Sequence, residues 1–190
     1  MDATEARSHL ETANSILARV PRLARPSGSM LIAWGSFAAF LDILTTLVAN
    51  GRLPVTVLWL NLAAFVAVIA FSVNNLRRIR ECESVAWVDI QLGRLFGAAF
   101  IAGMIASFGI APASALHPWV ASSIWNTLFG AIVLFVGFCG DRLALIAGLV
   151  IVLAVPIAAY AGNSAGFVLA AGFIIGYIGL GLYYRVARIG

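Results

Sequence analysis

Three polar residues that could bind a ligand or a proton occur inside long apolar stretches of this chain: Asp42, Asn61 and Asn126. A carboxyl group can take up a proton or attract a cation, and an amide can both donate and accept hydrogen bonds. An Asp near the centre of a membrane costs about 2.5–3.5 kcal/mol on insertion scales, so such residues usually face a bundle interior and serve a function. These three residues are therefore the first candidates for a functional site.

The candidate residues are predicted to lie at one depth. Asp42 lies eight positions before Asn50, Asn61 eight after Leu53 and Asn126 eight after Pro118, and these three flanking residues fall on one side of the membrane. At 1.5 Å per residue, this places them about 12 Å below the outer edge. We predict an outward-facing polar pocket with Asp42 as its ionisable centre, which binds a small solute or a proton. Its candidate residues are Asp42, Asn61, Asn126, Thr46 and Ser123.

The same polar layer has a purely structural interpretation. Polar side chains also hold helices together in lipid, typically by less than about 2 kcal/mol each. In this interpretation Asp42 is part of an interhelical clamp and no ligand is bound. The substitution Asp42→Asn separates the two, because it removes the ionisable group and keeps the shape of the side chain.

Six apolar stretches are long enough to hold these residues in transmembrane helices, since about 20 residues cross the hydrocarbon. The chain is 62% hydrophobic and 11% charged, whereas soluble domains are usually about 25% charged. The fold class is therefore all-α and polytopic. The predicted spans are Leu31 to Ala49, Pro54 to Asn75, Leu95 to Ala111, Trp119 to Cys139, Leu143 to Ala161 and Ala165 to Tyr184.

The arginines predict the orientation. If six helices alternate in direction, every arginine except Arg52 falls on one side, and the chain has no lysine. The positive-inside rule then puts both termini in the cytoplasm. The partner of this charge is expected to be anionic lipid headgroups, and nucleic acid is not expected. The expected membrane-surface charges include Arg22, Arg25, Arg77, Arg78 and Arg80.

Two regions are expected outside the membrane, both on the cytoplasmic side. Residues 1–29 form an amphipathic N-terminal segment, and residues 30–190 form the transmembrane domain, with a cytoplasmic loop at 76–94. The chain has no Walker loop, no dinucleotide fingerprint and no catalytic pair within its spans. We therefore expect neither enzyme activity nor a bound metal or cofactor.

Small residues at four-residue spacing predict where helices touch. In lipid, small side chains let two helix backbones approach closely, and packing replaces the hydrophobic driving force. This spacing could serve packing within one subunit or the formation of a homo-oligomer. The predicted packing residues are Gly35, Gly103, Gly172, Gly176 and Gly179.

Two functions fit these features. In the first, the protein is permease-like or channel-like and handles a small solute or a proton through the layer around Asp42. In the second, it is an accessory or sensory membrane subunit. A cytoplasmic or membrane protein partner would then dock on the Arg-rich N-terminal segment and the 76–94 loop.

Short patterns support a membrane role. Leu31-Ile32-Ala33-Trp34-Gly35 opens the first span, Gly140-Asp141-Arg142-Leu143 precedes the fifth, and Tyr184-Arg185 closes the sixth. With these patterns the chain resembles a family of small bacterial six-helix integral membrane proteins that has no established activity. The resemblance implies a six-helix fold in a bacterial inner membrane and a regulated membrane function, and it implies no chemistry.

Overall fold

The structure, a computed structural model, describes residues 27–82, 94–95, 97–103, 105–106 and 119–187. These residues form helices joined by short turns, and no strand occurs among them. The helices are α2 (Gly28–Ala49), η1 (Val55–Leu58), α3 (Trp59–Cys82), α5 (Trp119–Phe138), α6 (Arg142–Tyr160), η2 (Gly162–Ser164), α7 (Ala165–Phe173), η3 (Ile174–Ile178) and α8 (Gly179–Ala187).

Within the described residues, five helices are long and apolar enough to cross a membrane: Gly28–Ala49, Val55–Asn75, Trp119–Phe138, Arg142–Tyr160 and Gly162–Ala187. The described residues confirm an all-helical fold, and these five candidate spans agree with five of the six predicted spans to within a few residues at each end. The remaining predicted span, Leu95 to Ala111, is described only in part, and its residues 97–103 and 105–106 are helical.

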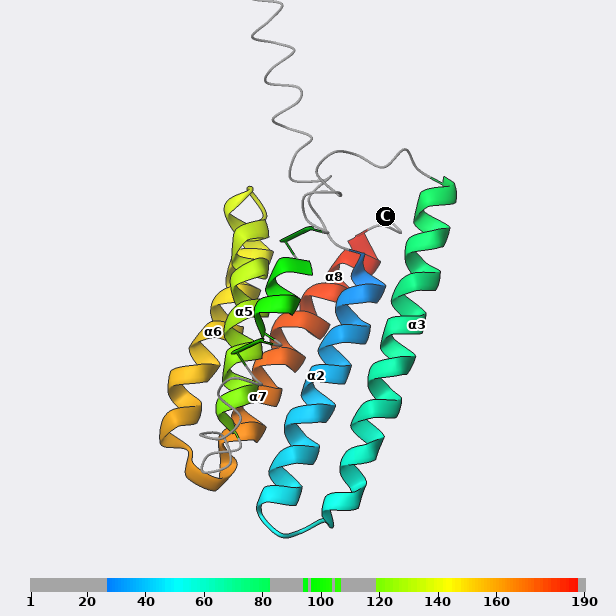
Figure 1. Cartoon of the computed structure of the whole chain (residues 1–190). Helices are drawn as coiled ribbons and strands as arrows, with labels where there is room; N and C mark the ends of the chain where they lie inside the picture. Colours follow the sequence, from blue (N-terminus) through cyan, green and yellow to red (C-terminus); the bar gives the residue numbers. More distant parts are fainter. Residues whose placement is uncertain (1–26, 83–93, 96, 104, 107–118, 188–190) are drawn as a thin grey trace, which may run out of the picture.

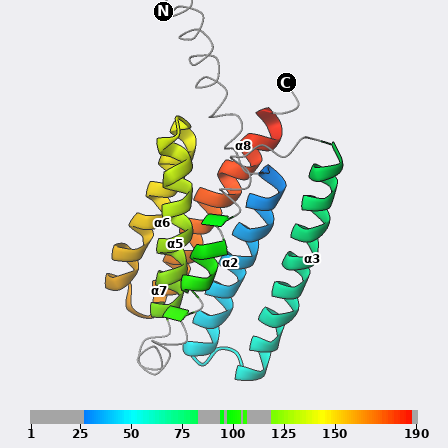
Figure 2. The same ribbon diagram turned by 45° about the horizontal axis from the view of Figure 1, so that its top comes forward.

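The helices lie roughly side by side (Figure 1). α5 and α6 form an antiparallel pair, the continuous run α7–η3–α8 packs between that pair and α2, and α3 lies outermost beside α2 (Figure 2). At one end, the start of α2 touches α8 near Gly181 and Arg185. At the opposite end, the Asn50 side chain donates a 3.0 Å hydrogen bond to the Asn163 carbonyl. We call these the Gly28 end and the Arg52 end.

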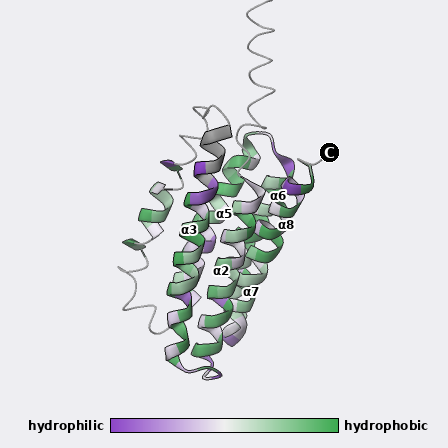
Figure 3. Ribbon diagram, turned by 90° about the vertical axis from the view of Figure 1, so that its right-hand side faces the viewer, coloured by the Kyte–Doolittle hydropathy of each residue, from purple (hydrophilic) through white to green (hydrophobic). Residues whose placement is uncertain are grey.

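Hydrophobic residues predominate along the helices (Figure 3), and many large apolar side chains are exposed on the outside of the bundle. Leu60, Val66 and Ile157 are each more than half exposed, and only 6% of the most apolar stretch of α3 is buried. In water such a surface would promote aggregation, whereas in a bilayer the equally apolar lipid tails cover it. The exterior is therefore compatible with a membrane-embedded protein.

Glycines lie where the helices approach most closely. A Cβ on Gly35 would come within 2.6 Å of the Tyr177 Cβ, and one on Gly172 within 2.8 Å of the Ala154 Cβ. A Cβ on Gly176 would come within 2.5 Å of Ile151. These three predicted packing residues therefore sit at contacts between helices of the same chain.

Two further glycines differ from each other. Gly103 lies under the Trp125 ring, because an added Cβ would meet that ring at 2.6 Å. A Cβ on Gly179 would meet nothing within 4 Å, so the expectation that Gly179 packs against another helix is not met among the described residues. Gly179 lies on a different side of its helix from the other two: Gly179 is exposed, whereas Gly172 and Gly176 are buried against α6.

The turn between α5 and α6 is fixed by Asp141. Its carboxylate accepts hydrogen bonds from the backbone N–H groups of Leu143 and Ala144. These groups lie in the first turn of α6, where the helix itself supplies no acceptor for them. The Tyr184 hydroxyl donates to the same carboxylate at 2.8 Å. Asp141 thus ties the α5–α6 turn to α8 at the Gly28 end.

Two expectations about charged segments have different outcomes. α3 continues to Cys82 instead of ending at Asn75, so Arg77, Arg78 and Arg80 belong to its last turns and not to a loop. Charged residues can extend a helix past the hydrocarbon, because the helix satisfies its own backbone hydrogen bonds in water or lipid. Arg22 and Arg25 lie outside the described residues, as do most of segments 1–29 and 76–94.

Candidate ligand site

Asp42 lies on α2 with its side chain turned into the bundle, where it is 1% exposed. The Asn126 side-chain amide lies 3.4 Å from the Asp42 Oδ2 and donates a long hydrogen bond to it. The Ser122 side chain, one turn earlier on α5, also hydrogen-bonds the carboxyl group. A buried carboxyl group therefore joins α2 to α5 through polar contacts, as the depth argument predicts for Asp42 and Asn126.

Asn126 is only partly satisfied by its neighbours. The side chain is fully buried, and its Nδ2 also donates to the Ser122 carbonyl at 3.0 Å. Its Oδ1 has no hydrogen-bond partner within the described part of the chain, and the same is true of the buried Oδ1 of Asn61. Burying an acceptor without a partner costs free energy, about 1–3 kcal/mol for a neutral group. Two unsatisfied acceptors therefore occur on helices that flank Asp42.

A cavity of about 350 Å³ lies beside this carboxyl group. Asp42 and Asn61 are the polar residues of its wall apart from the ring groups of Trp and Tyr, and aliphatic side chains from α2 and α3 complete it. The remaining lining residues are Trp34, Phe37, Phe65, Phe100, Trp125, Phe129, Phe173 and Tyr177. The predicted pocket is thus mainly aromatic, and the expectation of a mostly polar pocket is wrong.

Six of these rings form a closed circuit that we call the aromatic belt: Trp34, Phe37, Phe65, Phe100, Trp125 and Phe129. Each ring contacts the next, with centroid distances from 5.5 to 6.2 Å, and the contact between Phe129 and Trp34 closes the circuit. These distances are typical of favourable aromatic pairs. The belt joins α2, α3, the helical segment 97–103 and α5 around the cavity.

The last span adds Phe173 and Tyr177 to the wall. Tyr177 lies in η3, a short stretch of π-helix between α7 and α8, and its hydroxyl donates to the Phe129 carbonyl at 3.3 Å. On the other side of the belt, the Trp34 indole N–H donates to the Ser72 hydroxyl at 3.0 Å. Both donors are thereby occupied. π-Helical turns within longer helices frequently occur at functional sites.

Two predicted site residues lie apart from the cavity. The Thr46 hydroxyl donates to the Asp42 backbone carbonyl at 2.6 Å, and the same hydroxyl packs against Gly166 of α7. The Ser123 hydroxyl donates to the Trp119 carbonyl at 3.0 Å. Neither residue belongs to the cavity wall, and both hydroxyls bond to the carbonyl four residues earlier on their own helix, as hydroxyls on helices readily do. The structure thus places Asp42 and Asn61 in the cavity wall, and Asn126 outside the wall but in contact with Asp42.

The aromatic belt was missed by the sequence reasoning, although a signal for it exists. Trp34 and Phe37 are three residues apart, and Trp125 and Phe129 are four apart. Residues at these spacings share one face of a helix. Asp42 follows the first pair by five residues, and Asn126 comes directly after Trp125. An aromatic pair close in sequence to a polar residue, in each of two predicted spans, would have indicated the cavity.

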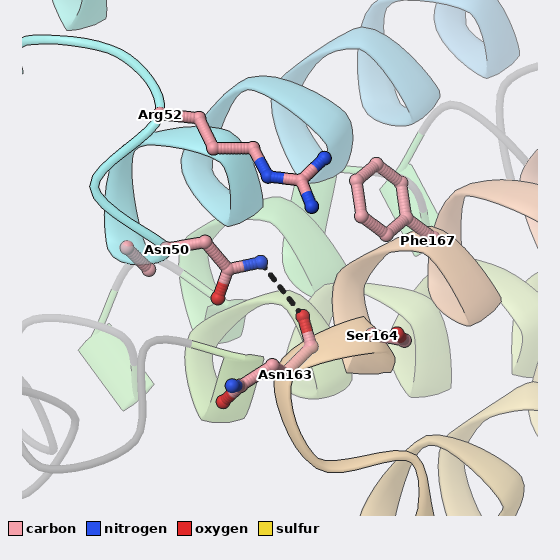
Figure 4. Close-up of a pocket in the computed structure, with 6 residues that line it drawn as sticks. Asn50, Arg52, Asn163, Ser164 and Phe167 are labelled. Carbon is pink, nitrogen blue, oxygen red and sulfur yellow. Dashed lines mark hydrogen bonds between the residues drawn. The ribbon is translucent and has the colours of Figure 1, made fainter.

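A second hollow, of about 460 Å³, opens at the Arg52 end (Figure 4). Asn50, Arg52, Asn163, Ser164 and Phe167 line it, and the hydrogen bond from Asn50 to the Asn163 carbonyl crosses it. Arg52, Asn163 and Ser164 are exposed. This hollow is a surface depression between two turns, and it contains no buried charged group.

Comparisons with protein-family models, with curated proteins and with solved structures found no match. The functional argument for this chain therefore rests on the residues around Asp42.

Proposed function

We propose that this protein is a six-helix integral membrane protein of the bacterial inner membrane that moves a small solute or a proton, and that it catalyses no covalent reaction. The observation that carries the proposal is the contact of Asp42 with Asn126 beside a 350 Å³ cavity. Ligand cavities are commonly about 300–1,000 Å³, mostly apolar, with a few convergent polar groups. An ionisable residue at membrane depth is expected to serve a function.

The direction of the helices supports a sixth crossing. α3 reaches the Gly28 end, where Asn75 on it donates to the Ser27 hydroxyl at 3.4 Å. α5 begins at the Arg52 end, because it pairs antiparallel with α6 (Figure 1). The end of α3 and the start of α5 therefore lie at opposite ends of the bundle. The helical segment 97–103 lies beside α3 and α5, since Phe100 contacts rings on both.

The described arginines support the predicted orientation. Arg185 lies beside Gly28, Arg142 follows Asp141, which bonds to Tyr184, and Arg77 comes two residues after Asn75, which bonds to Ser27. Arg52 comes two residues after Asn50, which bonds to Asn163 at the opposite end. The positive-inside rule then places the Gly28 end in the cytoplasm. In that orientation Asp42 is nearer the outer surface, because α2 runs from Gly28 to Ala49 towards the outside.

The experiment uses the full chain reconstituted in vesicles that contain a trapped pH dye. A pH gradient is imposed, and the internal pH and the uptake of cationic, neutral and anionic solutes are followed. Wild-type vesicles should carry a flux that Asp42→Asn abolishes, because the variant has no group that gains or loses a proton. The variant should elute and melt like the wild type.

Wild-type vesicles that are no more permeable than empty vesicles to protons and to every solute tested would contradict the proposal. In that event the accessory role becomes the better explanation. Residues 1–29 and the segment after Cys82 would then be the place to look for a docked partner.

A further inference from the structure

We propose that the cavity beside Asp42 binds an organic cation that carries an apolar group, such as an aryl or alkyl ammonium ion. This ligand class rests on the proposed function, which assigns the cavity as a solute site. It goes beyond that function because it states the charge and the shape of the solute.

The polar groups around the cavity are suited to a positive charge. Asp42 offers carboxylate oxygens, and the Oδ1 of Asn61 is a buried acceptor without a partner in the described chain. Among the described residues of the cavity wall none is basic. Any ammonium ion brings a positive charge to these oxygens, and one that keeps an N–H can also donate a hydrogen bond to them, whereas an anion would meet unfavourable charge.

The aromatic belt favours the same charge. Ring faces attract cations through their quadrupoles, and cages of several aromatic rings are used to recognise quaternary ammonium groups. The hydroxyl of Tyr177 and the indole N–H of Trp34 are committed to Phe129 and Ser72. These two polar groups are therefore not available to recognise an anion.

The size of the cavity agrees with a solute of this kind. A volume of about 350 Å³ accommodates one small aromatic or alkyl group together with its charged head, and it lies at the lower end of the range of ligand cavities. A site that binds only a proton needs a carboxyl group and a path for the proton. Such a site would not explain a closed ring of six aromatic side chains.

The test compares three probes of nearly equal size on the purified full chain. Benzyltrimethylammonium is the cation, neopentylbenzene is its neutral isostere with carbon in place of nitrogen, and benzenesulfonate is the anion. Binding is measured by the rise in melting temperature and by Trp fluorescence. The cation should bind about 5- to 30-fold more tightly than the neutral isostere, as desolvated cation–π contacts allow, and the anion should not bind.

Two variants locate the binding site, and a third is the control. Asp42→Asn should remove most of the preference for the cation over its isostere. Trp125→Leu should weaken cation binding about 3- to 30-fold, because it opens the aromatic belt. Trp59→Leu removes a Trp that is 73% exposed on α3, and it should leave binding unchanged. The comparison of cation and isostere on the wild type needs no variant to fold.

The outcomes separate this inference from the transport proposal. Equal binding of the cation and the neutral isostere, or stronger binding of the anion, overturns the ligand class even if a flux depends on Asp42. Preferential cation binding that survives Asp42→Asn and Trp125→Leu also overturns it. Cation binding lost in both variants supports the ligand class even if no solute crosses the vesicle membrane, and the transport proposal then fails alone.

Discussion

The amide of Asn126 lies 3.4 Å from the carboxylate of Asp42, and 84 positions of the chain separate the two residues. The contact joins α2 to α5 in the interior of the bundle, and both residues are almost completely buried. The same contact could both hold the two helices together and present a carboxyl group to the cavity.

The contact should contribute measurably to stability. In a double-mutant cycle of Asp42→Ala and Asn126→Ala, we expect a coupling energy of about 1 kcal/mol, similar to other hydrogen bonds between membrane helices. Unfolding in detergent measures it. Thr127→Ala is the matched control, because Thr127 bonds to the Ser123 carbonyl and is exposed. Equal coupling of Asp42 to Thr127 would show that the effect does not arise from the contact.

Binding of a cation should depend on pH. Protonation neutralises Asp42, so the affinity for benzyltrimethylammonium should fall as the pH is lowered. The groups that face Asp42 from α5 and α3 are Ser122, Asn126 and Asn61, which do not titrate. Tyr177 also lines the cavity, and its hydroxyl is committed to the Phe129 carbonyl. Affinity measured across a series of pH values should rise with pH in wild type and stay flat in Asp42→Asn.

The capping interaction at Asp141 should stabilise the Gly28 end. Tyr184→Phe removes the 2.8 Å hydrogen bond to a buried carboxylate and should cost about 1–2 kcal/mol of unfolding free energy. Tyr183→Phe changes a neighbouring Tyr that is 46% exposed, and it should have little effect. Equal melting temperatures of the two variants would contradict a stabilising role of this contact.

Two glycines of the last span should respond differently to alanine. Gly176→Ala would force a shift against Ile151 and the Ala147 carbonyl, and overpacking of this kind costs about 1–3 kcal/mol. Gly179→Ala meets open space three residues later, so it should be neutral or stabilising by up to about 1 kcal/mol. Thermal unfolding of both proteins is the measurement. A destabilised Gly179→Ala protein would indicate that this face is covered by a partner.

The orientation can be read from thiol labelling in intact cells. With Cys82 and Cys139 replaced by Ser, a thiol introduced as Asn163→Cys lies at the exposed Arg52 end and should react with a membrane-impermeant maleimide from outside. A thiol introduced as Arg142→Cys, which is also exposed, should react only after the cells are opened. The reverse pattern would place the Gly28 end outside.

Much of the fold could be predicted from the sequence. Continuous apolar stretches determine helices in lipid, so the ends of α2, α5 and α6 agree with expectation to within a few residues. The extension of α3 to Cys82 could not be predicted, because hydropathy reports where the hydrocarbon ends and not where the helix ends.

The site was predicted in part. Depth counting identified Asp42, Asn61 and Asn126, because rise per residue converts position into height. It could not distinguish a side chain that faces the cavity from one that bonds to its own helix, as Thr46 and Ser123 do. To predict the aromatic belt, one needs the rotation of each helix and the order of the helices around the bundle, as well as depth. Phe65 and Phe100 are each the single belt residue on their helical segment, so no pair at helical spacing marks them.

The most direct test of the central claim, that Asp42 forms a ligand site and is not only a clamp, is the melting temperature of wild type and Asp42→Asn across pH and a panel of small solutes. A ligand that binds only the folded state raises stability by mass action, by about 2.7 kcal/mol at one hundred times its dissociation constant. We predict a shift with solute and pH in wild type that disappears in Asp42→Asn. Identical, flat responses in the two proteins would contradict the account and leave Asp42 as an interhelical clamp.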